Sequence, residues 1–393
     1  MNEDLKKLSR HWMDEFRTTI PKTKALRKTI HQNPQVSGEE GPTRALMAEE
    51  LGISFDSVAE TGAIGRVGPA TGPSIGIRGE LDALPVSENT NVEWSAKSDK
   101  MHACGHDVHL AALAGVVNAA KVLDLPFGLV PILQPREETY PSGALDISES
   151  GLLEKHEVCH VIGAHVHPAI QLGSIAAGSG FVNAAAGEIE IKVFGKGGHG
   201  AYPHKASDVA IPTAQIALGL SEVVRRTNDP MSPAVVSIGS MSAGQGAANV
   251  LPQSGTIFAT VRSTSTKKNQ ELAHQIDQFA SYTAESLGCF AETRYTPGEP
   301  ALVNSRSLAD KFETYAAAID IPIAETMRSL GADDFSYYGE KCPSLMCFVG
   351  VKEGNTPSLH DAEFLPPDEA ITHVAKAFIT GYIAAADILM EPK

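Results

Sequence analysis

The hydrophobic positions between residues 185 and 296 follow two different spacings. In Gly187–Phe194 every second residue is apolar, which is the spacing of a half-buried strand. In Ala206–Thr227 the apolar residues recur near helical spacing, and Pro212 must then fall in an early turn or kink the helix. The region predicts six elements, in the order strand, helix, strand, strand, helix, strand: Gly187–Phe194, Ala206–Thr227, Ala234–Gly239, Thr256–Val261, Thr266–Leu287 and Cys289–Tyr295. This βαββαβ order is typical of a compact ferredoxin-like sandwich of one sheet and two helices.

The rest of the chain shows short, continuous apolar runs separated by helical patterns. Such runs are typical of strands buried on both faces of an α/β sheet. The predicted strands are Ser74–Arg78, Gly128–Gln134, Val161–Val166 and Ser344–Val349, and the predicted helices are Leu110–Leu123, Arg306–Ile319 and Pro367–Leu389. A chain of 393 residues also exceeds what one core normally organises. We therefore predict an α/β catalytic domain formed by residues 1–184 and 297–393, with an inserted domain at 185–296.

Composition narrows the class of protein. With 42% apolar and 20% charged residues, the chain has the make-up of an ordinary soluble globular protein. Its net charge of −15 argues against nucleic acid and anionic membrane surfaces as partners. The five cysteines are few and odd in number, which favours a reducing compartment over a disulfide framework. Neither a signal-peptide pattern nor a bilayer-spanning run is present, so we expect a cytoplasmic protein.

The densest chemistry lies in residues 101–109. This segment holds one cysteine, three histidines and one aspartate: Cys104, His102, His106, His109 and Asp107. Thiolate and imidazole suit a borderline-soft divalent cation such as zinc, and a cysteine two residues from a histidine can chelate within one loop. The segment therefore predicts a metal site.

Further polar residues follow the predicted strands. Glu80 and Asp82 come after the first strand, Glu137 and Glu138 after the second, and His165 at the end of the third. Open α/β sheets bind their ligands beyond the carboxyl ends of the strands, so these clusters are expected to share one site. At such a site one carboxylate can ligate the cation while another accepts a proton from water.

At this point the chain resembles a known family, the dinuclear metal-dependent amidohydrolases. These include hippurate hydrolases, aminoacylases and indole-acetyl-amino-acid hydrolases and, more distantly, carboxypeptidase G and diaminopimelate deacetylases. The resemblance covers about residues 20–390. The matching pieces are Leu81-Asp82-Ala83-Leu84-Pro85, His102-Ala103-Cys104-Gly105-His106-Asp107, Glu137-Glu138, Ala164-His165-Val166, Gly197-Gly198-His199, Tyr202-Pro203-His204, Asn249-Val250-Leu251-Pro252, Val261-Arg262, Asp334-Phe335 and Leu359-His360.

The resemblance implies a role for each matching residue in the catalytic domain. Glu137 would be the general base and acid, and Asp82 would orient a ligating imidazole from behind it. Two divalent cations (zinc, manganese, cobalt or nickel) would bind per subunit. Their ligands would be Cys104, His106, Glu138, His165 and His360.

The resemblance also implies that the inserted domain serves as a lid and in dimerisation. His199 is similar to a histidine that reaches across a dimer to polarise the scissile carbonyl. Asn249 and Arg262 resemble residues that hold the carboxylate of the substrate. A homodimer or homotetramer is therefore expected, and the small-molecule substrate would be an N-acyl-amino acid.

Several alternatives stay open. The enzyme would cleave the amide of N-acyl-amino acids, or act as a dipeptidase or carboxypeptidase, or the chain would be a non-catalytic, metal-containing binding protein. His102, His109 and His167 are expected to support the site rather than to ligate. The chain also departs from the usual pattern at Arg136 and Tyr140, which we expect to alter the pocket.

Overall fold

A computed structural model describes residues 1–244 and 246–392 of the chain. The chain divides into two compact units, and each unit is made of more than one segment of the sequence. Unit 1 consists of Met1–Val182, Val303–Met327 and Asp334–Lys393. Unit 2 consists of Asn183–Leu302 and the short segment Arg328–Asp333.

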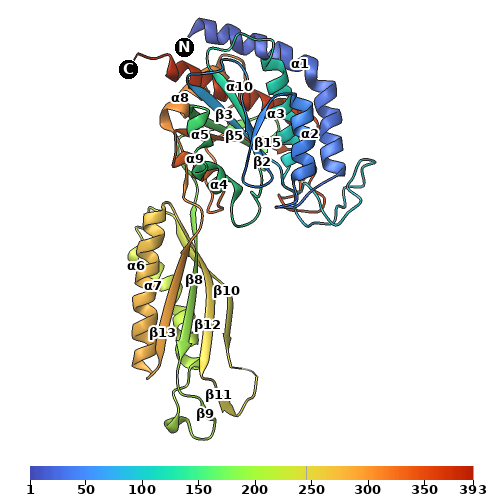
Figure 1. The fold of residues 1–393 in the computed structure, drawn as a ribbon. Helices are drawn as coiled ribbons and strands as arrows, with labels where there is room; N and C mark the ends of the chain where they lie inside the picture. The colour runs from blue at the N-terminus through green and yellow to red at the C-terminus, as the bar shows by residue number, and fades with distance from the viewer. Residues whose placement is uncertain (245, 393) are drawn as a thin grey trace. The chain divides into compact units, whose positions relative to one another are not determined.

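Unit 1 is built on a seven-stranded sheet with the order β1-β2-β4-β3-β5-β15-β6 (Figure 1). Its central strands β4, β3, β5 and β15 are mutually parallel, whereas β1, β2 and β6 pair antiparallel. Parallel neighbours end at the same edge, so the residues that follow these central strands are brought together. The strands are β1 (Phe55–Val58), β2 (Gly62–Gly65), β3 (Ser74–Glu80), β4 (Gly128–Gln134), β5 (Val158–Gln171), β6 (Ile175–Ala176) and β15 (Ser344–Lys352). A two-stranded sheet joins β7 (Gly180–Asn183) to β14 (Leu302–Asn304).

Helices cover both faces of the large sheet. The adjacent β5 residues Ile162 and Gly163 point to opposite faces because side chains alternate along a strand. A Cβ at Gly381 of α10 would lie 2.5 Å from Ile162, and a Cβ at Gly163 would lie 2.7 Å from the ring of Phe335, next to α9. The helices of unit 1 are α1 (Glu3–Gln32), α2 (Gly41–Leu51), α3 (His106–Ala120), α4 (Gly143–Glu149), α5 (Leu152–Lys155), α8 (Arg306–Ala317), α9 (Ser336–Gly339) and α10 (Glu369–Leu389).

The strands and helices predicted for unit 1 are present with shifted ends, and the strand predicted at Val161–Val166 is longer, so that His165 lies in the middle of β5 rather than at its end. The predicted helix at Leu110–Leu123 begins earlier, at His106, because Gly105 adopts a φ of 86° and turns the chain into α3. This helix is buried along almost its whole length, which explains its run of small apolar residues. Its first turn carries His106, Asp107 and His109 into the interior.

Unit 2 contains a four-stranded antiparallel sheet, with the order β10-β12-β8-β13. Its elements follow the chain in the order β8, α6, β10, β12, α7 and β13. Pro212 lies in the first turn of α6, where it costs no hydrogen bond. The bounds are β8 (Ala185–Phe194), α6 (Ala210–Thr227), β10 (Ala234–Ala243), β12 (Ser254–Ser263), α7 (Thr266–Ser286) and β13 (Phe290–Pro297). A small ribbon of β9 (Gly198–His199) and β11 (Val250–Leu251), with the 3-10 helix η1 (Pro203–Lys205), completes the unit.

A buried ion pair ties α1 to α3. Arg27 is 0% exposed, and its Nε donates to Asp107 Oδ2 at 2.9 Å. Its other two nitrogens donate to the carbonyl of Pro366 at 2.6 Å and to Asp368 at 3.0 Å. Burial lowers the pKa of His31, but the neighbouring Asp107 and Glu88 carboxylates outweigh it and raise the pKa to about 9.

Among the described residues, the helices are all too short or too polar to cross a membrane.

Candidate metal centre

The five residues proposed as ligands converge at the carboxyl edge of the unit 1 sheet. Their ligand atoms form two groups, each with all atoms within 4.8 Å of one another. One group is Cys104, His106 and His165, and the other is Cys104, Glu138 and His360. Because Cys104 belongs to both groups, the arrangement offers two adjacent cation positions that share one sulfur.

The first group is fully buried, and its histidines are held by the backbone. His106 Nδ1 lies 2.8 Å from the carbonyl oxygen of Asp82, and His165 Nδ1 lies 2.7 Å from the carbonyl oxygen of Val166. A carbonyl only accepts, so both Nδ1 atoms carry a proton, and in the neutral imidazole each Nε2 atom then has a lone pair for a cation. His165 Nε2 lies 3.3 Å from Cys104 Sγ.

The second group is more open to solvent. The His360 side chain is 52% exposed, and its Nε2 lies 3.5 Å from Glu138 Oε1. The backbone of His360 adopts a φ of 67°, and its N–H donates to the Ala103 carbonyl at 2.9 Å, next to Cys104 in the chain. Burial favours the neutral form of Glu138, but His360 and His106 outweigh it and lower the pKa of this carboxyl.

Asp82 contacts two of the proposed ligands from behind. Its carboxylate accepts hydrogen bonds from the backbone N–H of Glu138 at 2.9 Å and from the Ser37 hydroxyl at 2.7 Å. Its main-chain carbonyl, rather than its side chain, holds His106; the nearer carboxylate oxygen is 3.8 Å from His106 Nδ1. Burial raises the pKa of Asp82.

Glu137 lies beside the first group. Its Oε2 is 3.8 Å from His106 Nε2, and its side chain is only 12% exposed. Ligand atoms of His106, Glu137 and Glu138 also lie within 4.8 Å of one another. The structure therefore places Glu137 next to the candidate ligands on the loop after β4.

The residues present fit a divalent cation. His106 Nε2 is buried and makes no hydrogen bond within the described part of the chain. Burial and the carboxylates of Glu138 and Glu137 raise the pKa of the Cys104 thiol well above its usual range. A divalent cation reverses this, since a coordinating thiol is deprotonated. The donor set of sulfur, imidazole and carboxylate suits zinc and its neighbours in the transition series.

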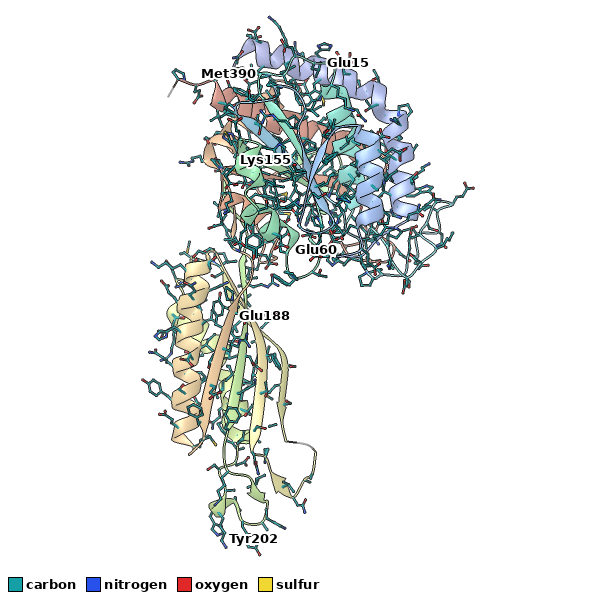
Figure 2. All side chains as sticks on the ribbon, viewed as in Figure 1. Glu15, Glu60, Lys155, Glu188, Tyr202 and Met390 are labelled. Carbon is teal, nitrogen blue, oxygen red and sulfur yellow. The ribbon has the colours of Figure 1, made fainter. Side chains whose placement is uncertain are left out.

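The proposed substrate residues belong to unit 2 and lie in two separate places there. His199 and Asn249 are adjacent, because Val250 pairs with His199 and the Asn249 carbonyl accepts the N–H of Gly200 at 2.8 Å. The ring of His199 lies 5.6 Å from that of Tyr202, which marks this loop in Figure 2. A cavity of about 1060 Å³ is lined by both His199 and Asn249.

Arg262 lies elsewhere in unit 2. It stands eight residues after Ser254, the first residue of β12, and this length of strand spans roughly 27 Å. Its Nη1 donates to the carbonyl of Leu330 at 3.1 Å. Within unit 2, Arg262 and Asn249 therefore do not meet at one carboxylate.

Sequence reasoning gave His109 only a general supporting role, and it did not find Arg78. Both are 0% exposed and lie beside the site: His109 contacts Glu80, and Arg78 forms an ion pair with Glu80. The signal was available for His109, because residues three apart on a helix share a face and His109 follows His106 at that spacing.

Of the two residues that depart from the family pattern, Arg136 contacts residues outside the ligand groups. Arg136 forms ion pairs with Asp146 and Glu60 and donates to the carbonyl of Pro141 at 3.1 Å. Tyr140 is 61% exposed. These contacts give Arg136 a structural role in the loop after β4.

Comparisons with known proteins identify the family of the chain. Residues 76–380 match the model of peptidase family M20/M25/M40. The chain is 35% identical over 345 residues to the Arabidopsis thaliana protein IAA-amino acid hydrolase ILR1-like 4, covering 83% of this chain and 76% of that protein. It is 29% identical over 372 residues to an N-acetyldiaminopimelate deacetylase of Bacillus licheniformis, covering 92% of this chain and 97% of that protein.

A solved structure and one longer relative complete the comparison. The Bacillus subtilis YXEP protein, described as a dinuclear metal-binding peptidase of the M20 family, superposes with a TM-score of 0.82 at 27% identity, covering 94% of this chain and 99% of that one. A Rhodococcus jostii protein named putative glutamate–cysteine ligase 2-3 is 30% identical over 377 residues. The aligned region covers 94% of this chain but only 47% of that longer protein. The chain therefore belongs to peptidase family M20/M25/M40, a family of hydrolases.

Proposed function

We propose that the protein is a metal-dependent amidohydrolase that cleaves the amide bond of N-acyl-amino acids and releases a carboxylic acid and an amino acid. The observation that carries the proposal is the pair of ligand groups sharing Cys104, with Glu137 beside them. The names of the Arabidopsis and Bacillus licheniformis relatives, an IAA-amino acid hydrolase and an N-acetyldiaminopimelate deacetylase, support amide cleavage.

Cys104, His106 and His165 would hold one cation, and Cys104, Glu138 and His360 a second. When bound, such cations supply Lewis acidity toward water and the scissile carbonyl. Glu137 takes the proton from the attacking water, because its carboxylate lies beside this set and is not needed as a ligand. It then passes the proton to the leaving amine. Asp82 keeps Glu138 and His106 in place during both steps.

Unit 2 is proposed to be a ferredoxin-like lid and dimerisation domain. His199 would polarise the substrate carbonyl of a neighbouring subunit, and Asn249 and Arg262 would hold the substrate carboxylate. Asn249 precedes β12 and Arg262 lies near the other end of that strand, and this separation supports the proposal, since both can reach one carboxylate only if they come from different subunits. The guanidinium of Arg262 suits a carboxylate.

A metallo-dipeptidase is the second candidate, and the family name favours it. The two functions differ in the α-amine of the substrate, which is blocked in an N-acyl-amino acid and free in a dipeptide. The relatives with 35% and 29% identity carry the names of a hydrolase of amino acid conjugates and of a deacetylase, which favours the blocked substrate.

The first test is a substrate panel. Protein loaded with zinc, manganese or cobalt is expected to release amino acids from N-acetyl and N-aroyl amino acids, measured by amine detection. Removal of the metal by a chelator should abolish turnover, and re-addition should restore it. Preferential cleavage of free dipeptides would select the dipeptidase instead. No cleavage of either class with any of the three metals would reject both functions and leave a metal-containing binding protein.

The shared-site dimer is tested by complementation. A His199→Ala subunit is mixed with a Glu137→Gln subunit, each nearly inactive alone. If His199 acts on the neighbouring site, mixed dimers contain one complete site, and random pairing should recover roughly a quarter of wild-type activity. Absence of recovery, with mixed dimers demonstrated by mass spectrometry, would place His199 in its own subunit's site or outside the mechanism.

A further inference from the structure

His109 is a buried histidine with both ring nitrogens engaged. It follows His106 by three residues on α3, and its ring centroid lies 4.9 Å from that of His165. Its Nδ1 is 3.1 Å from Glu80 Oε2, and its Nε2 accepts the backbone N–H of Val166 at 3.0 Å. A backbone N–H only donates, so Nε2 of His109 is unprotonated and Nδ1 carries the proton. This leaves His109 without a lone pair for a cation, although its ligand atoms lie close to those of Glu80 and His106.

The backbone of Val166 is held at its N–H, in the His165–Val166 peptide, and at its carbonyl, in the Val166–His167 peptide. Its N–H donates to His109, and its carbonyl accepts the Nδ1–H of His165 at 2.7 Å. The second bond fixes the tautomer of His165 and leaves His165 Nε2 facing Cys104 Sγ at 3.3 Å. A rotation of the backbone at Val166 would therefore displace the carbonyl that orients His165 and move its Nε2 relative to Cys104 Sγ.

A chain of buried ionic groups fixes His109 in turn. Glu80 is 0% exposed and forms an ion pair with Arg78, which also donates to Asp334 at 3.0 Å and to Gln134 at 3.0 Å. Gln134 donates to both oxygens of Asp334, and the Tyr338 hydroxyl donates to Gln134 at 2.9 Å. Paired with a guanidinium, Glu80 stays an acceptor and therefore requires the proton on His109 Nδ1.

We propose that His109 is a positioning residue for the metal centre: through the Val166 N–H it holds the backbone that orients His165, and the Glu80–Arg78–Asp334 chain locks His109 in the tautomer this requires. The inference rests on the proposed function, because it takes His165 as a ligand. Removal of a group that orients a ligating histidine typically lowers the metal affinity by about 10- to 100-fold.

The first experiment measures zinc affinity by competition with a chromophoric chelator, with zinc as the only ligand. His109→Leu should weaken zinc binding by about 10- to 100-fold. His109→Gln should remain within a few-fold of wild type, because the glutamine Oε1 reaches the place of Nε2 and can accept the Val166 N–H. The matched control is His11→Leu, which removes an exposed histidine on α1 and should leave the affinity unchanged. Wild-type affinity in His109→Leu would overturn the proposal, as would equal losses in the leucine and glutamine variants.

The second experiment uses the wild-type protein, so it tests the proposal even if a variant fails to fold. In protein with 15N-labelled histidine, NMR should show His109 protonated at Nδ1 and bare at Nε2, both without and with zinc. The Nε2 resonances of His106 and His165 should shift on zinc addition. A shift of His109 Nε2 by zinc would make it a ligand, and a proton on Nε2 would exclude the bond to Val166; either result overturns the proposal. Both readouts use no substrate, so failure of amide hydrolysis is distinguished from failure of this inference.

Discussion

Glu137→Gln is expected to lower kcat by about 10²- to 10⁴-fold, the usual contribution of a general base. The amide of glutamine occupies the same volume but cannot take a proton from water at neutral pH. Glu137 Oε2 lies 3.8 Å from the buried His106 Nε2, so the carboxylate stands beside the ligand set. Steady-state kinetics on an N-acetyl-amino acid and elemental analysis of the same sample together measure the effect.

The metal content decides how this result is interpreted. Zinc content should equal that of wild type, because Cys104, His106 and Glu138 stay intact. Glu149→Gln, an exposed change on α4, is the matched control and should retain full activity. A Glu137→Gln variant within tenfold of wild type would move the base to another residue. Loss of the metal in that variant would make Glu137 a ligand.

Arg27→Met is expected to destabilise unit 1 by about 3–5 kcal/mol, the usual cost of leaving one member of a buried ion pair unpaired. The side chains of Arg27 and Asp107 are 1% and 0% exposed, so water cannot replace the guanidinium. Methionine keeps much of the volume but supplies none of the three hydrogen bonds that Arg27 donates. His31, whose pKa is raised to about 9, still faces Asp107 at neutral pH and should keep the loss from exceeding this range.

Urea unfolding in the presence of a chelator measures this effect without a contribution from bound metal. The chain has two tryptophans, Trp12 and Trp94, and both belong to unit 1, so their fluorescence follows that unit. Arg17→Met on the same helix is the matched control, because Arg17 is 68% exposed and pairs with Asp14. It should change stability by no more than about 0.5 kcal/mol. Equal losses of unfolding free energy in the two variants would show that the buried Arg27–Asp107 pair stabilises the unit no more than an exposed pair does.

The meeting of Glu80, Asp82, Glu137 and Glu138 was predictable because these residues follow or end β3 and β4, whereas His165 lies within β5 and not at its end as predicted. Polar groups after β3 and β4 must meet at one edge once the strands are parallel neighbours, and this rule needs no knowledge of side-chain contacts. The spacing of Cys104 and His106 indicated that the site binds a metal ion. The elements of the inserted region were also predictable, because Gly187–Phe194 alternates regularly and the helices show clear spacing.

Other features depend on contacts between distant residues and left no local pattern. The helix α1 is an exception: it is 30 residues long and was not predicted, although its buried residues Leu5, Trp12, Phe16, Leu26 and Ile30 recur at helical spacing on either side of Pro21. The pairing of Arg78 with Asp334 joins residues 256 positions apart. The carboxylate of Asp334 accepts hydrogen bonds from Arg78, Gln134 and Ser142, all of which are distant in the chain.

The segment Arg328–Asp333 has a practical consequence for dissecting the protein. It belongs to unit 2, although 25 residues of unit 1 precede it in the chain. The N–H of Ala184 donates to the Gly331 carbonyl at 2.8 Å, and Arg262 donates to Leu330 at 3.1 Å. A recombinant fragment that ends at Leu302 would therefore lose these acceptors and leave the Arg262 guanidinium without its backbone partner. Transplanting this module between relatives requires moving two pieces of the gene together.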